Sequence, residues 1–486
     1  MTIPSPLRLL RCGITCLLTA VLSGCTLSKA PSHSQVVDSA LPAGTTIPPH
    51  WIAGGNGKGV NDNWLKSFHD PRLDAIVAEA IANNLDLRQA AAKVEMARET
   101  VIIVGSQLKP QVGLDLGGSS TRDGDHDDWF TSRKGVAGVA WELDVWGKLR
   151  AQRGAAEAAY QATDLDYAYG IQSLAATAAK SWYLNIETSE LLEIAEQTVK
   201  VYSELLDLVK VRRDAGKVSD LDVAEASANF NQAQSDLRTA QGMSSETRRS
   251  LEVLLGRYPA AQLKVAEDLP VVPPPIQAGL PSSLLVRRPD MVAAERRVLE
   301  AFRSEEAARL ALLPSFSLNL DGGKLSDNLL SVLHANPWFF SAALGMSVPI
   351  YTGGALRAKV EIGNARQQEA VAAYGAVALT AFREVENGLM NEALLAQRLE
   401  FDRDVLHDRT EAVRLGRLKY DAGAIDLLSL LQLQAAQILS QVQVVKMQNA
   451  RLANRIDLHL ALGGSFDRTP AVISSVYPKD PRKIKS

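Results

Sequence analysis

The stretch Asp214-Ala-Gly-Lys-Val-Ser-Asp-Leu-Asp-Val223 recurs 207 residues later as Asp421-Ala-Gly-Ala-Ile-Asp-Leu-Leu-Ser-Leu430. Each copy separates one long helical pattern from another. A glycine at the same place in both copies predicts a sharp helix-to-helix turn that needs a positive φ. We therefore expect two helical hairpins, whose tip turns are Asp214-Ala215-Gly216 and Asp421-Ala422-Gly423.

Other landmarks repeat at nearly the same spacing. Helical patterns begin at Asp86 and Asp290 and end at Pro110 and Pro314, and both pairs lie 204 residues apart. Leu462-Gly463 likewise follows Leu255-Gly256 by 207 residues. Such a constant register indicates a tandem duplication, in which each copy contains a helix, two strands, a long helix, a turn and a return helix.

The expected strands lie at 111–121, 135–146, 315–323 and 339–350, where apolar residues alternate with small or polar ones. Each is about 10 residues long with one apolar face, which is typical of a transmembrane β-strand. A soluble sheet with exposed edges is the alternative. Lipid cannot satisfy an open sheet edge, so a membrane sheet must close into a barrel, and four strands are too few. The barrel would be shared between chains, with about eight strands from two copies or about 12 from three, and conduction favours the trimer.

The helical hairpins are expected over 148–255 and 356–462. Their first helices contain no proline and are rich in Ala, Leu, Glu and Gln. About 60 residues give a rod of roughly 90–100 Å, which needs neighbouring helices to bury its apolar stripe. The expected fold class is mainly α with a membrane β-barrel, built from two helix-strand-strand-long helix-helix repeats.

The N-terminus reads as a targeting segment. Arg8 and Arg11 precede a short apolar run, and Leu22-Ser-Gly-Cys25 is similar to the bacterial lipobox, in which the cysteine is acylated. We therefore predict a lipoprotein signal peptide over 1–24 and lipidation, including palmitate, at Cys25. Thr26 favours the outer membrane over retention at the inner one. An ordinary secretory signal is the alternative.

The remaining segments follow from composition. Pro, Gly, Ser and Thr predict tethers and connectors rather than packed domains. The expected segments are an N-terminal tether 25–62, a first repeat 63–257, a Pro-rich connector 258–285, a second repeat 286–464 and a tail 465–486.

Composition argues against several functions. A net charge of -3 makes nucleic acid an improbable partner. Cys12 and Cys16 would leave with the signal, so no disulfide or cysteine metal site is expected. The seven histidines fall singly, and no phosphate-binding loop is present. We predict no enzyme activity, no cofactor and no metal; a loosely bound cation at His126 in the acidic loop 122–134 is the minor alternative.

Together, several motifs resemble the TolC-like outer membrane factor family, and within it the NodT-type efflux lipoproteins. The resemblance covers nearly all of the mature chain. The segments that carry it are Phe68-His-Asp-Pro71, Asn83-Asn-Leu-Asp-Leu-Arg88, Trp141-Glu-Leu-Asp-Val-Trp-Gly-Lys148, Arg287-Arg-Pro-Asp290, Ala293-Ala-Glu-Arg-Arg297, Pro349-Ile-Tyr-Thr-Gly-Gly354 and Leu462-Gly463.

This resemblance implies a homotrimer with a 12-strand barrel in the outer membrane and a helical tunnel in the periplasm. A periplasmic adaptor (membrane fusion) protein and an inner-membrane transporter would complete an efflux pump for drugs, toxic small molecules or metals. The family conducts substrates and catalyses nothing. Type I protein secretion and a lipid-anchored periplasmic coiled-coil adaptor are the alternatives.

The resemblance also implies a gate at the hairpin tips. Where the family carries inward aspartates, this chain has the uncharged Ser429 and Gln432. Tyr420 and Asp222 match a tyrosine and an acid that tie the family's tips, and Glu225 lies on the same face as Asp222. We expect closure through Leu428 packing and a Tyr420–Asp222 hydrogen bond, with adaptor contact at the tip turns. The alternative is that these polar residues only solvate helix ends.

Overall fold

The computed structural model describes residues 27–55, 60, 62–122, 129–266, 268–326 and 338–464, without the side chains of 121, 129–133, 325 and 326. The predicted signal peptide, Cys25, residues 123–128 of the acidic loop and the tail 465–486 lie outside these residues. The signal peptide and the acylation of Cys25 therefore stay predictions.

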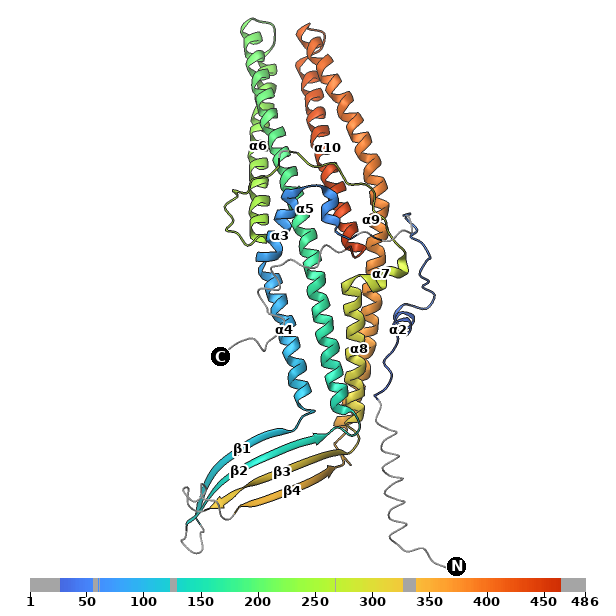
Figure 1. Ribbon diagram of the computed structural model, residues 1–486. Helices are drawn as coiled ribbons and strands as arrows, with labels where there is room; N and C mark the ends of the chain where they lie inside the picture. The colour runs from blue at the N-terminus through green and yellow to red at the C-terminus, as the bar shows by residue number, and fades with distance from the viewer. Residues whose placement is uncertain are drawn as a thin grey trace, which may run out of the picture. The chain divides into compact units, whose positions relative to one another are not determined.

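The chain contains two helical hairpins and one sheet (Figure 1). Hairpin 1 consists of α5 (Lys148–Asp214) and α6 (Asp220–Leu254), and hairpin 2 of α9 (Ala355–Asp421) and α10 (Leu427–Ala461). The other elements are α2 (His33–Ala40), η1 (Trp64–Phe68), α3 (Pro71–Asn83), α4 (Leu85–Ser106), β1 (Gln111–Arg122), β2 (Trp129–Leu143), α7 (Pro281–Arg287), α8 (Pro289–Leu310), β3 (Ser315–Ser326) and β4 (Phe339–Ser347).

The fold divides into two compact units. Of the described residues, those within 1–45, 92–166 and 290–377 form unit 1, and those within 46–91, 167–289 and 378–486 form unit 2. The 67-residue helices α5 and α9 contribute to both units. None of the helices in the described part of the chain combines the length and apolar content that a bilayer span requires.

The sheet belongs to unit 1. Its strands follow the order β1-β2-β3-β4, and all neighbours are antiparallel. Within the described residues, β1 and β4 each pair on one side only. Apolar side chains on both outer strands stay largely exposed: Val112 at 79%, Leu116 at 73%, Phe340 at 76% and Leu344 at 71%. An apolar surface left uncovered by its own chain marks contact with lipid or with other protein.

The strand bounds differ from the expected ones. β2 begins at Trp129 rather than 135, because residues 129–134 pair with the end of β1 as far as Arg122↔Trp129. Backbone pairing continues there without an alternating apolar pattern to reveal it. β4 ends at Ser347 rather than 350, since Pro349 has no N–H to donate.

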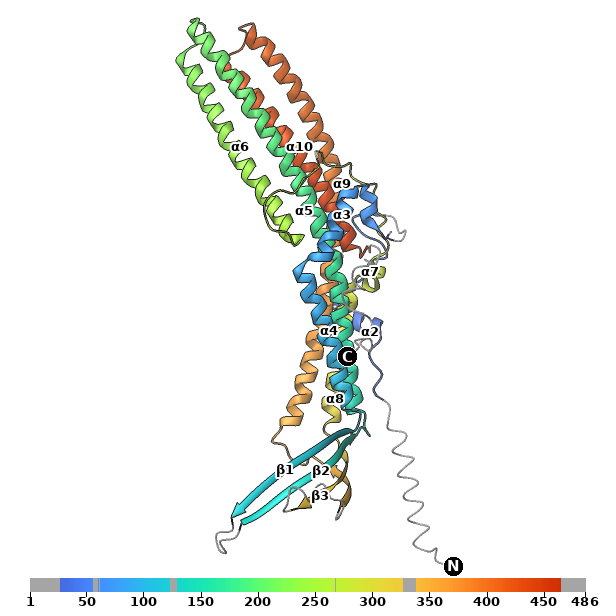
Figure 2. The same ribbon diagram turned by 60° about the vertical axis from the view of Figure 1, so that its left-hand side comes forward.

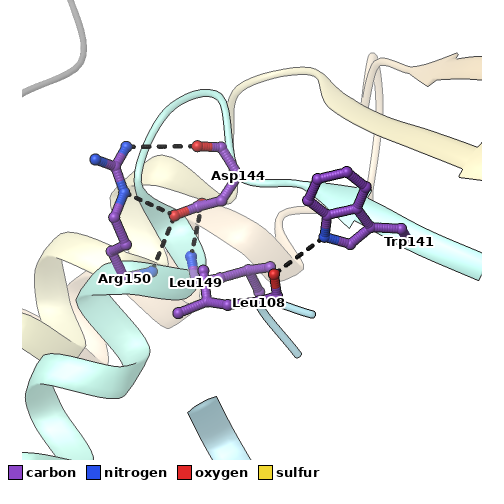
Figure 3. Close-up of polar contacts among 5 residues, drawn as sticks. All are labelled: Leu108, Trp141, Asp144, Leu149 and Arg150. Carbon is purple, nitrogen blue, oxygen red and sulfur yellow. Dashed lines mark hydrogen bonds and ion pairs between the residues drawn. The ribbon is translucent and has the colours of Figure 1, made fainter. Parts of the chain in front are cut away.

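The junction between β2 and α5 is held by side chains of the Trp141–Lys148 motif (Figure 3). Asp144 accepts hydrogen bonds from the backbone N–H groups of Leu149 at 2.9 Å and Arg150 at 3.0 Å, which satisfies the first turn of α5. The Trp141 indole donates to the Leu108 carbonyl at 3.1 Å, just beyond α4. The motif therefore fixes the start of a very long helix to the preceding strand and helix.

The predicted tether is more ordered than expected. Residues 33–40 form α2, whose N-cap Ser32 makes a capping box with Gln35. Val36 of this helix is only 3% exposed. The Ser-x-x-Gln pattern at 32–35 was the available signal, and the Pro- and Ser-rich composition around it concealed the helix.

Other family-like motifs serve as helix caps in unit 2. Asp70 accepts from the backbone of Arg72 and Leu73 to cap α3, and its second oxygen accepts from the Trp182 indole at 3.0 Å. Asn84 accepts from the Leu87 N–H at 3.0 Å and so caps α4. These polar residues hold helix starts.

The Arg287-Arg288 pair meets the Leu462-Gly463 motif at the end of α10. Arg287 donates to the Gly463 carbonyl, and the buried Arg288 donates to the Ala461 carbonyl and to Glu384 at 2.6 Å. Two motifs 175 residues apart thus form one structural site. This contact gives both arginines a structural role.

His459 lies in the apolar core of unit 2. Its ring is 5% exposed and stacks on Trp64 with a centroid distance of 5.5 Å. Burial, with Arg455 nearby, lowers the pKa of His459 to about 3. The folded protein therefore keeps this imidazole neutral where the unfolded chain would protonate it.

Acid should consequently destabilise the fold through His459. Below about pH 6.5, His459 binds a proton in the unfolded chain but not in the folded chain. The free energy of unfolding therefore falls by up to about 1.4 kcal/mol per pH unit until about pH 3. Denaturant unfolding of His459→Leu should show a shallower loss between pH 6 and 4 than the unaltered protein. His407→Ala, at an exposed site, is the control; equal slopes for all three proteins would contradict this assignment.

Candidate functional site at the hairpin tips

Both hairpins turn at the predicted glycines. Gly216 has φ 69° and Gly423 has φ 75°, which confirms the positive φ expected from the repeated motif. The N–H of Lys217 reaches back to the Arg212 carbonyl at 2.9 Å, and that of Ala424 to the Lys419 carbonyl at 2.8 Å. This Schellman pattern satisfies the last carbonyls of α5 and α9. The tip residues themselves stay exposed to solvent.

The return helices begin with side-chain caps. Ser219 and Asp222 form a capping box at the start of α6, and Asp426 accepts from the Ser429 N–H at 2.9 Å at the start of α10. These hydrogen bonds from Ser429 lower the pKa of the Asp426 carboxyl. The caps hold each turn in one geometry.

An apolar cluster joins the two hairpins near their tips, where they lie side by side in both views (Figures 1 and 2). Hairpin 1 supplies residues from α5 and α6, and hairpin 2 supplies the end of α9 and the start of α10. The buried members are Tyr202, Leu205, Leu206, Val209, Ala226, Ala233, Tyr420, Leu427, Leu430 and Leu431.

Arg212 makes a polar contact between the same hairpins. Its guanidinium lies 4.4 Å above the centre of the Tyr420 ring, and Nη2 donates to Asp421 at 3.0 Å. Nη1 also donates to the Tyr420 carbonyl at 3.4 Å. We call Arg212, Tyr420 and Asp421 the inter-hairpin contact. Sequence reasoning missed Arg212, although its counterpart in the second repeat, Lys419, is also basic.

The expected Tyr420–Asp222 hydrogen bond is absent among the residues that the structure describes. The Tyr420 side chain is buried, and its hydroxyl has no hydrogen-bond partner within that part of the chain. The Asp222 carboxylate instead accepts from the Ser219 N–H at 2.8 Å and from the Ser219 hydroxyl at 2.7 Å. Glu225 is half-buried one turn farther on and accepts through its backbone carbonyl from Asn229. The cap of α6 therefore uses the same Asp222 carboxylate that the predicted hydrogen bond from Tyr420 would need.

The residues expected at a constriction lie on another face of α10. Leu427, Leu430 and Leu431 point into the inter-hairpin cluster, whereas Leu428 is 49% exposed and Gln432 is exposed. Ser429 is half-buried behind its hydrogen bond to Asp426. Leu428 and Gln432 lie one turn apart, and their exposed side chains could contact another protein chain.

The tip region holds no chemistry of a catalytic or metal site. Among the residues that the structure describes, no group of three or more His, Cys, Asp or Glu side chains could hold a metal ion. The polar groups of the tips serve instead as caps, turns and contacts between hairpins.

Comparison with known proteins decides the family. Residues 76–257 and 280–464 match the family described as outer membrane efflux protein, one matched segment in each repeat. The chain belongs to this family. As an outer membrane efflux protein, it is the outer-membrane channel component of an efflux pump and not an enzyme. The alternative of a periplasmic adaptor is wrong.

Curated relatives match this efflux protein over almost their whole length. The pyoverdine export outer membrane protein OpmQ of Pseudomonas putida is 30% identical over 481 residues, which cover 96% of this chain and 98% of the relative. The cation efflux system protein CusC of Escherichia coli is 28% identical over 453 residues, covering 92% and 97%.

Solved structures confirm the expected fold class. A crystal structure of CusC has a TM-score of 0.79 at 25% identity and covers 90% of this efflux protein and 99% of that chain. The CmeC outer membrane channel of Campylobacter jejuni has a TM-score of 0.84 at 19% identity, with 93% and 98% covered. At that identity, CmeC shows the shared fold alone.

Proposed function

We propose that three copies of this chain form a trimeric channel whose 12 strands close one barrel in the outer membrane. The observation that carries this proposal is the open sheet, whose edge strands β1 and β4 each pair on one side only and present exposed Val112, Leu116, Phe340 and Leu344. Three such sheets, joined β4 to β1, would leave no unpaired edge in lipid. The width of about 12 strands leaves room for a lumen.

The helical hairpins form the periplasmic tunnel in this proposal. The exposed tip turns 214–216 and 421–423 are the surface for a periplasmic adaptor, which connects the channel to an inner-membrane transporter. Acylation of Cys25 adds a lipid anchor to the barrel. The proposed domain limits are those expected from sequence, except that α2 lies in the tether and α7 begins inside the connector.

The cargo is a small molecule or ion that the inner-membrane transporter selects. Relatives of nearly equal identity are named for pyoverdine export, toluene efflux and cation efflux, at 30%, 29% and 28%. Such different cargoes at similar distances support a passive duct without its own cargo site. We infer efflux rather than type I protein secretion from these names.

The gate is the closed arrangement of the tips. Within each chain the inter-hairpin contact holds hairpin 2 against hairpin 1. Between chains, Leu428 and Gln432 of three α10 helices would face one another at the mouth. The uncharged Ser429 and Gln432 leave this mouth without an acidic ring.

Cysteine crosslinking tests the shared barrel. Val112→Cys on β1 is combined in turn with one cysteine at each of 343–347 on β4, and the protein is oxidised in outer membranes. We expect that at one or more of these β4 positions denaturing gels will show dimers and trimers joined by disulfides. The matched control is Ala140→Cys with Asn319→Cys, a β2–β3 pair that crosslinks within one chain. Dimers as the largest species would favour an eight-strand barrel, and monomers at every register would overturn the proposal.

A further inference from the structure

The segment just after the predicted acylation site is docked on α8 by its backbone. The Ser28 N–H donates to Glu306 Oε1 at 2.5 Å, and Arg303 Nη1 donates to the Ser28 carbonyl at 2.9 Å. Arg303 and Glu306 are themselves paired at 2.6 Å. Both polar groups of one peptide position are therefore held by two charged side chains of one helix.

These two side chains are unusually buried for charged residues on a helix. The side chain of Glu306 is 7% exposed and that of Arg303 is 17% exposed. A buried carboxylate is costly unless its oxygens are hydrogen-bonded. Here Oε1 accepts from Ser28 and Oε2 from Arg303, so residue 28 completes the site.

The same segment continues along unit 1. His33 pairs with Glu295 at 2.8 Å, about three turns before Glu306 on α8, so the segment and α8 run in opposite directions. Ala40 at the end of α2 meets α9 so closely at Gly375 that a Cβ there would lie 2.2 Å from the Ala40 carbonyl oxygen. At the other end, Leu27 Cδ2 lies 3.0 Å from where a Cβ on Gly147 would stand. Residues 27–40 thus have a fitted path, with Leu27 beside the β2–α5 junction.

We propose that Arg303 and Glu306 form a receptor for the acylated N-terminus of their own chain. This inference rests on the acylation of Cys25 in the proposed function. By holding residue 28, the receptor confines Cys25 to within about 11 Å of it, since three extended residues reach no farther. The lipid anchor is thereby kept within that reach of residue 28, in the same unit as the sheet.

Arg303 and Glu306 bind only backbone atoms of residue 28. A matched test is therefore possible, in which the side chain and the backbone of residue 28 are changed separately. Ser28→Ala keeps the N–H and carbonyl groups and should stay docked. Ser28→Pro removes the N–H, and Arg303→Met with Glu306→Leu removes both receptor groups together, so that neither is left buried alone. Arg309→Met breaks the Arg309–Glu305 pair on the same helix without touching residue 28.

Trypsin cleavage after Lys29 reports docking, because a protease needs the segment free. Purified full-length protein in mild detergent is digested, and each rate is divided by that of a peptide with the same sequence. We expect Ser28→Pro and the double variant to be cut roughly tenfold faster or more than the unaltered protein, Ser28→Ala and Arg309→Met, because cleavage follows the population of the opened segment. Equal rates for all proteins would overturn the receptor.

Radioactive palmitate labelling of the same proteins separates this inference from the lipid anchor itself. A labelled protein with equal cleavage rates means that the anchor exists and the receptor does not. An unlabelled protein that shows the tenfold difference means that residue 28 docks but carries no lipid anchor, which overturns the acyl part of the inference.

Discussion

Arg212→Ala should open the closed channel. The substitution removes a cation–π contact and a charged hydrogen bond from a site where Tyr420 is only 4% exposed. We assign the contact about 2 kcal/mol in each chain, after discounting for the 22% exposure of the arginine. That loss shifts an opening equilibrium by a factor of about 30 for each chain.

Single-channel recording in planar bilayers at low salt measures the effect. The unaltered protein should show a small closed-state conductance, and Arg212→Ala frequent openings to a larger one. Lys419→Ala is the matched control, since it removes a positive charge from the equivalent position of hairpin 2, where the side chain is exposed. Identical traces for Arg212→Ala and the unaltered protein would refute a role for the inter-hairpin contact in closure.

Tyr420→Phe separates two accounts of the gate. The phenyl ring keeps the face that Arg212 covers and loses only the hydroxyl, which has no partner among the described residues of its own chain. If the inter-hairpin contact closes the tips, this variant should behave like the unaltered protein. An open channel would instead indicate that the hydroxyl bonds to a neighbouring chain, as the Tyr420–Asp222 hypothesis requires.

Arg455→Leu should cause a larger loss of stability than any surface substitution. Arg455 has a side chain only 1% exposed, and it bonds to both oxygens of Glu392 and to the carbonyls of Pro273 and Pro274. It therefore joins α9, α10 and the Pro-rich connector in unit 2. Removing one member of such a buried pair costs about 3–5 kcal/mol, because the remaining groups stay desolvated without partners.

Denaturant unfolding in mild detergent should show this loss as a lower midpoint for Arg455→Leu. Adding Glu392→Leu should recover part of it, since the uncompensated carboxylate then disappears. The exposed pair Lys180–Asp457, between α5 and α10, gives the control: Lys180→Ala should cost less than about 1 kcal/mol. A loss for Arg455→Leu no greater than that of Lys180→Ala would contradict the structural role.

Local patterns explain how much of this fold the sequence predicts. Repeated turns, alternating strands and proline-free helical runs each depend on neighbouring residues, and they predicted both hairpins, four strands and the duplication. The family-like motifs were equally visible, although their roles as caps and as contacts between helix ends were not. The contacts of Asp144, Asp70 and Arg288 could not be predicted, because their partners lie on other elements or across turns.

The parts that sequence reasoning missed depend on long-range pairing. Arg212 and Tyr420 lie 208 residues apart, and nothing in either local pattern indicates that they meet. Residues 129–134 belong to β2 because they pair with β1, and the Asp222 carboxylate, which was assigned to a hydrogen bond with Tyr420, caps the start of its own helix. The docked residues 27–40 read as a linker because their order depends on α8 and α9.

The inter-hairpin contact also makes the two halves of the duplicated chain non-interchangeable. In the second repeat Lys419 stands in place of Arg212, and in the first repeat Arg213 stands in place of Tyr420. A ring assembled from six copies of the first half would lack the Tyr420 ring, and one assembled from six copies of the second half would lack the Arg212 guanidinium. The tip of each chain thus has a polarity, in which Arg212 of hairpin 1 is the donor and Tyr420 and Asp421 of hairpin 2 are the acceptors.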